Sequence, residues 1–222
     1  MAKTAPCPAA LRYLDLRRAS LVFVLGAVVA AVSVAWIDRP LALAIAHVLP
    51  PGASVPSTIP DLLIEFVIVV GLAGVVGWIW ARWHGNERLL RVTPLVAATM
   101  PISLGVSELG KWLFGRTTTR LFVHHPRAYG FHWGDGHSMF FGFPSGHMLV
   151  ATALIVVVIA VYPRWRWLGW ALLAALALAM LLTSYHFLGD IVAGWLIGAT
   201  LAQAILAADA RLRPAKMPQT RP

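Results

Sequence analysis

The sequence is poor in charged residues, in acidic residues above all, and in cysteine. Only 12% of its 222 residues are charged, whereas soluble domains average roughly a quarter. So few charges exclude an ordinary water-facing surface, and a hydrophobic content of 59% excludes a disordered chain. The single cysteine, Cys7, excludes an internal disulfide framework and a multi-cysteine zinc site.

Long apolar runs dominate the chain instead, and its mean hydropathy is +0.75. A helix that crosses a membrane needs about 20 mostly apolar residues. This length predicts spans at Ser20–Ile37, Leu62–Ala81, Val92–Leu113, Pro144–Tyr162, Trp167–Ser184 and, roughly, Phe187–Ala208. The first run is longer than the core of a signal peptide, so we expect it to remain in the protein. The apolar run Pro40–Leu49 is too short to cross.

We therefore expect an all-α polytopic membrane protein, folded as a single domain over residues 1–222. Its six transmembrane helices would form a bundle. The run Pro40–Leu49 would form a short interfacial or re-entrant helix after the first span.

Basic residues are distributed unevenly between the two sides of these predicted spans. With a cytoplasmic N-terminus, 13 of the 18 Lys and Arg residues lie inside. The positive-inside rule then predicts a multi-pass protein of the cell (inner) membrane with both termini cytoplasmic. It also explains the basic excess without a nucleic-acid partner. Four of the five outside cations precede the fourth span, where we expect an anion to bind: Lys111, Arg116, Arg120 and Arg127.

The segment Phe143–His147 carries the first of three short motifs on this outer side. Pro144 suits the first turn of a helix, and the free amides after it favour an anion. Ser145 adds a hydroxyl donor, and Gly146 lets the backbone approach closely. The alternative interpretation is a simple cap on the fourth span.

The other two motifs are a pair of residues each. His186 and Asp190 are spaced to share one helical face, where the carboxylate could fix one ring nitrogen and leave the other as a nucleophile or base. A structural polar contact is the alternative. Lys111 and Arg116 lie at the end of the third span, where they could bind an anion. The alternative is that their side chains only extend to the membrane interface.

Taken in order and on one side of the membrane, these motifs resemble those of the type 2 phosphatidic acid phosphatase (PAP2) superfamily. That family has a Lys followed by Arg, then Pro-Ser-Gly-His, then a His with Asp four residues later. The resemblance covers residues 111–190, and the span layout extends it over most of the chain. Two family arginines are missing, at Thr118 and Met180. Arg120, Arg127 or a loop histidine are candidates to replace them.

The resemblance implies a metal-independent phosphatase without cofactors that acts on a phosphorylated membrane lipid at the extracytoplasmic side. His186, oriented by Asp190, would attack a phosphomonoester or diphosphate and form a phosphohistidine. His147 would protonate the leaving group and then help to activate water. The residues implied to bind the phosphate are Lys111, Arg116, Ser145 and Gly146.

Several alternatives remain open at this point. A phosphotransferase would pass the phosphoryl group from His186 to another lipid. The missing arginines also allow a catalytically weakened relative that binds or translocates a phospholipid. A rhomboid-like intramembrane serine protease using Ser145 and His186, or a haem site on His147 and His186, would leave the cations without a role. The sequence identifies neither which lipid phosphate is the substrate nor the oligomeric state.

Overall fold

The computed structural model describes residues 16–49, 74 and 76–212. Within these residues the regular structure is helical, apart from one isolated antiparallel bridge between Arg116 and Phe131. At the N-terminal side, α1 (Leu16–Val32) runs through the π-helical η2 (Ser33–Ile37) into α2 (Asp38–Val48). The other long helices are α4 (Glu87–Phe114), α6 (Gly146–Val161), α7 (Arg166–Leu182) and α8 (Leu188–Leu212).

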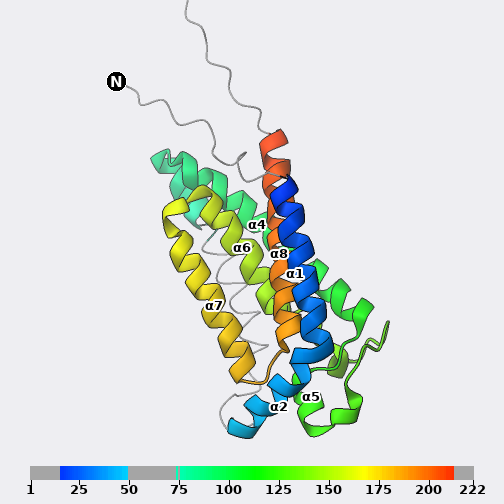
Figure 1. Cartoon of the computed structure of the whole chain (residues 1–222). Helices are drawn as coiled ribbons and strands as arrows, with labels where there is room; N and C mark the ends of the chain where they lie inside the picture. The colour runs from blue at the N-terminus through cyan, green and yellow to red at the C-terminus, as the bar shows by residue number, and fades with distance from the viewer. Residues whose placement is uncertain (1–15, 50–73, 75, 213–222) are drawn as a thin grey trace, which may run out of the picture.

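The long helices lie side by side as a bundle, with α6 packed against α4, α7 and α8 (Figure 1). Two glycines of α8 allow the closest of these approaches. A Cβ at Gly198 would overlap the carbonyl oxygen of Leu149, and one at Gly194 would lie 2.5 Å from the carbonyl oxygen of Ser145. Small residues of this kind let helix backbones meet in membrane bundles. The start of α6 is thereby held firmly against α8.

Among the residues that the structure describes, four helices are long and apolar enough to cross a membrane: Ser20–Val48, Glu87–Phe114, Pro163–Leu182 and Leu188–Leu212. α6 is apolar but shorter. The predicted all-helical fold with helices of membrane-spanning length is therefore confirmed for the described residues, whereas the predicted count of six spans is not. Most of the predicted span Leu62–Ala81 lies outside the described residues, although residues 76–84 are helical.

The predicted short helix after the first span is present but is not a separate element. α2 continues from α1 without a break in the helical backbone and turns away from the bundle (Figure 1). The π-helical turn between them accounts for the bend, because an inserted residue disturbs the regular hydrogen-bond ladder. Pro40 falls in the first turn of α2, and its missing N–H removes one hydrogen bond from the helix that continues from α1, next to the π-helical turn.

The two ends of the bundle differ in what they carry. α1 begins and α8 ends at one end, while α2, α5 (Thr119–His124) and the connection from α4 to α6 lie at the other (Figure 1). This connection also contains the short helices η3 (Pro126–Ala128) and η4 (Ser138–Phe140). The outward faces of α1 and α7 expose large apolar side chains, as lipid-facing helices do, among them Leu21, Val24, Leu25, Trp167 and Leu178.

Candidate active site

A sharp turn at the end of α4 separates two of the predicted site residues. Gly115 ends the helix in the left-handed region, with φ +54°, and its N–H bonds the carbonyl oxygen of Lys111. A Cβ at Gly115 would overlap the carbonyl oxygen of His132. The turn leaves Lys111 on the helix and directs Arg116 into the protein.

A cavity of about 380 Å³ lies between the end of α4, the start of α6 and the turn from α7 to α8. Five residues predicted from the sequence line it: Lys111, Arg120, Gly146, His147 and His186. The cavity is also lined by residues that were not predicted from the sequence, among them Ser107, Glu108 and Tyr185. Glu108 forms an ion pair with Lys111, with 2.6 Å between Oε1 and Nζ.

His186 is buried at the cavity wall, with 6% of its surface exposed. Its Nδ1 lies 3.1 Å from the carbonyl oxygen of Gly142 and 3.7 Å from Oδ2 of Asp190. Because a carbonyl oxygen only accepts, the nearer contact assigns the proton to Nδ1 and leaves the lone pair on Nε2. The sequence predicted Asp190 as the orienting group, whereas the structure gives Gly142 the shorter contact.

His147 occupies the first turn of α6, and its ring centroid lies 6.3 Å from that of His186. Its Nε2 is buried and has no hydrogen-bond partner among residues 16–49, 74 and 76–212. The two imidazoles therefore line one cavity, close enough for both to reach a single small group.

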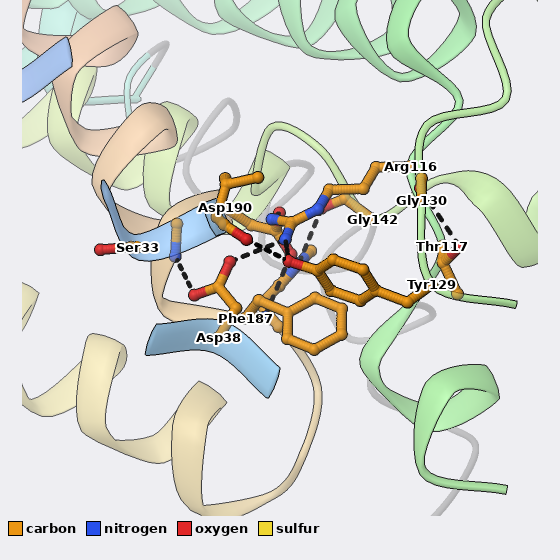
Figure 2. A network of polar contacts seen from close by, with 12 residues as sticks. Ser33, Asp38, Arg116, Thr117, Tyr129, Gly130, Gly142, Phe187 and Asp190 are labelled. Carbon is orange, nitrogen blue, oxygen red and sulfur yellow. Dashed lines mark hydrogen bonds and ion pairs between the residues drawn. The ribbon is translucent and has the colours of Figure 1, made fainter. Parts of the chain in front are cut away.

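Arg116 is fully buried and does not line the cavity. Its Nη1 donates to Oδ1 of Asp190, and its Nη2 lies 2.7 Å from Oδ2 of Asp38 and 2.7 Å from the hydroxyl of Tyr129 (Figure 2). Burial opposes the charged form, but Asp190 and then Asp38 outweigh it, so the pKa of Arg116 lies above its ordinary value. This placement differs from the phosphate contact predicted for Arg116, because carboxylates and a phenol already occupy both terminal nitrogens.

Asp38 was missed by sequence reasoning. It is buried on α2, and its Oδ1 accepts the backbone N–H of Gly189 at 2.9 Å. Asp38, Arg116 and Asp190 carry one net negative charge between them when all are ionised. Its position as an acidic residue between two apolar runs could have identified Asp38 from the sequence. Ionisable groups at membrane depth are costly and tend to be functional.

Ser145 caps α6 and does not line the cavity. It is fully buried, its Oγ accepts from the N–H of Met148 at 3.4 Å, and it donates to Sδ of Met180 at 3.5 Å. Met180 stands where the family pattern has an arginine and is itself buried. The structure thus shows the capping role that was the alternative interpretation of this serine.

The two candidate replacement arginines lie in different places. Arg120, in α5, lines the cavity with its guanidinium 5.3 Å from the ring centroid of Tyr185. Arg127, in η3, is exposed and is not part of the cavity wall. Thr118, at one missing arginine, lines the cavity beside Arg120. Burial raises the pKa of Tyr185, with Arg120 opposing that rise.

In the described ranges, no group of three or more His, Cys, Asp or Glu side chains could hold a metal ion. Comparisons with curated proteins and with solved structures gave no match. The model of the PAP2 superfamily matches residues 92–214, more than half of the chain. The matched range contains most of α4, the whole cavity wall from Leu104 to His186 and all of α8. Together with its apolar helices of spanning length, this match shows that the chain belongs to the PAP2 superfamily of phosphatases.

Proposed function

We propose that the protein is an integral membrane phosphatase that hydrolyses a lipid phosphomonoester or diphosphate through a phosphohistidine on His186. The observation that carries this proposal is the cavity itself. It joins two imidazoles, His186 and His147, to two cations, Lys111 and Arg120, at the N-terminus of an α-helix. That set of groups suits phosphoryl transfer, where positioning and charge stabilisation do most of the work.

In the first step, the Nε2 lone pair of His186 attacks phosphorus as the bond to the lipid oxygen breaks. His147, protonated once the phosphate anion is bound beside it, gives its proton to that departing oxygen. In the second step, neutral His147 accepts a proton from water, whose oxygen attacks phosphorus. The phosphorus–nitrogen bond then breaks, and phosphate leaves His186 in its starting form.

Charge that develops on the phosphoryl oxygens is stabilised by Lys111, Arg120 and the first amides of α6. On the other side of His186, Asp38 and Asp190 share a single guanidinium. The uncompensated negative charge lies near Nδ1 and favours the positively charged ring of a phosphohistidine. The buried ions thus support the nucleophile, while the cavity cations hold the substrate.

The residues that line the cavity come from the end of α4, α5, the start of α6 and the turn before α8. These elements lie at the end of the bundle opposite the start of α1 and the end of α8 (Figure 1). Basic residues near the helix ends on that opposite side include Arg88, Arg91, Arg164 and Arg211. By the positive-inside rule, these favour cytoplasmic termini and an extracytoplasmic cavity in the inner membrane. A lipid could then keep its tail in the bilayer while its phosphate enters the site.

A serine-protease mechanism fits this geometry poorly. The hydroxyl of Ser145 donates to the sulfur of Met180, on α7, and lies outside the cavity that contains His186. An activated serine needs its hydroxyl within hydrogen-bond reach of the base. We therefore retain the histidine as the nucleophile.

The test is phosphate release by the purified full chain in detergent, using dioctanoyl phosphatidate and a short-chain isoprenyl diphosphate. His186→Ala should release none, and acid-labile phosphate should accumulate on the parent protein. His84→Ala is the matched control, because His84 is exposed and lies outside the cavity. Absence of release from both lipids would refute the proposal.

A further inference from the structure

A hydroxyl on the α4 wall of the cavity has no role in the proposed mechanism. Ser107 lines the cavity, is 1% exposed, and its Oγ makes no hydrogen bond to any residue that the structure describes. Leaving a buried hydroxyl unpaired is destabilising. We therefore expect the hydroxyl of Ser107 to form a hydrogen bond with a group that is present when substrate occupies the cavity.

The surroundings of Ser107 indicate the chemistry of that partner. Ser107 lies one turn before Lys111 on the same face of α4. A Cβ at Gly146 would lie 2.6 Å from Oγ of Ser107 and 3.5 Å from Nζ of Lys111. Both donors therefore lie against the first residue of α6, where the backbone amides favour an anion.

We propose that Ser107 is a phosphate-binding residue whose hydroxyl donates to an oxygen of the transferring phosphoryl group. The inference deepens the proposed function and rests on it. Ser107 supplies a neutral donor in a chain that has Thr118 and Met180 where two arginines are expected. With the carboxylate of Glu108 beside Lys111, the cavity binds phosphate through hydrogen bonds as much as through charge.

A second serine on α4 provides a matched control. Ser103 lies one turn earlier and is likewise fully buried. Its Oγ donates to the carbonyl oxygen of Met100 at 2.9 Å, and it does not line the cavity. Replacing either serine by alanine removes one oxygen atom from the same helix, but only Ser107 faces the site.

The experiment compares Ser107→Ala and Ser103→Ala in the purified full chain. It measures turnover of dioctanoyl phosphatidate, binding of orthovanadate by calorimetry and thermal unfolding. We expect Ser107→Ala to lose about tenfold to a hundredfold in kcat/KM, as for one hydrogen bond to a charged group. Vanadate binding should weaken in the same direction. The variant should melt no lower than the parent, because an unpaired hydroxyl is removed, while Ser103→Ala keeps parental turnover and vanadate binding.

Parental turnover and vanadate binding in Ser107→Ala would overturn the inference. An equal loss in both variants would overturn it as well, because it would indicate packing of α4. If the alanine variant melts early, Ser107→Cys retains the size with a weaker donor and should show the same losses. If the parent protein is inactive but still binds vanadate, the proposed phosphatase activity is refuted. The role of Ser107 is then tested by the vanadate affinity of Ser107→Ala alone. A parent that binds none would refute both.

Discussion

Asp38 of α2 and Arg116, just beyond α4, form a fully buried ion pair, with 2.7 Å between Oδ2 and Nη2 (Figure 2). Asp38 precedes the range that the family model matches. A residue of α2, outside that range, therefore contributes to the ion pairs beside the site. The same carboxylate accepts the N–H of Gly189, the residue before Asp190. The N-terminal helix is thereby tied to the turn that carries His186.

Replacing Asp38 by asparagine should reduce both stability and turnover. Asparagine loses the charge-assisted bond to Arg116, which is worth about 1.5 to 3 kcal/mol, while Arg116 keeps its ion pair with Asp190. Arg116 would also neutralise Asp190 more fully, which removes the negative charge beside His186, so kcat should fall about tenfold, the effect of about 1.4 kcal/mol. Thermal unfolding and steady-state kinetics in one detergent measure the two effects.

The matched control for Asp38→Asn is Asp209→Asn. Asp209 is also buried and pairs with Arg91 at 3.0 Å, but on α8 far from the cavity. This variant should lose stability while keeping parental kcat. If both variants had the same kcat, Asp38 would have only a structural role.

The two cavity histidines should differ when each is replaced by alanine. His186→Ala should abolish phosphoenzyme and turnover, because it removes the attacking nitrogen. His147→Ala should still form phosphoenzyme slowly from a substrate with a good leaving group, such as p-nitrophenyl phosphate, which needs little protonation. Trapping of acid-labile phosphate distinguishes them, and phosphoenzyme in His186→Ala would contradict the assignment.

Arg120 and Arg127 should respond differently to truncation. Arg120 lines the cavity, so Arg120→Ala should lose on the order of a hundredfold in kcat, with little recovery at any salt concentration. The exposed Arg127 can act only by steering, so Arg127→Ala should show a small, salt-sensitive fall in kcat/KM. Parental kcat in Arg120→Ala would leave Lys111 as the main cation of the site.

Gly115→Ala should unfold at a lower temperature than the parent and lose activity. The left-handed backbone costs an alanine about 1 kcal/mol, and the added Cβ also overlaps the carbonyl oxygen of His132. Gly130→Ala is the control, because nothing lies within 4 Å of its Cβ position. Equal melting temperatures for the two variants would contradict the role given to the Gly115 turn.

Inhibitors should separate the proposed chemistry from metal-dependent hydrolysis. Orthovanadate should inhibit, because it can adopt the five-coordinate geometry of phosphorus in transfer. EDTA should leave turnover unchanged, because the proposed nucleophile is a histidine nitrogen. Loss of turnover with EDTA that a divalent ion restores would refute the scheme.

The sequence by itself determined the class of the protein and the local position of its motifs. Apolar runs of spanning length must satisfy their backbone hydrogen bonds within the segment, which requires helices in a membrane. Local pattern also placed Lys111 in the last turn of α4 and His147 in the first turn of α6. These features depend on neighbours along the chain, so composition and spacing suffice to predict them.

The tertiary structure alone decided which side chains face the cavity. Arg116 comes soon after Lys111 in sequence, yet the turn at Gly115 sends it to Asp38, 78 residues earlier in the chain. The choice of Arg120 over Arg127, and of Gly142 as the partner of His186, likewise depends on how the connection from α4 to α6 folds back. Spacing along one helix determines only which residues share a face. A buried charge instead turns toward the opposite charge that the fold brings nearest, because leaving it unpaired away from water costs far more than bending a loop.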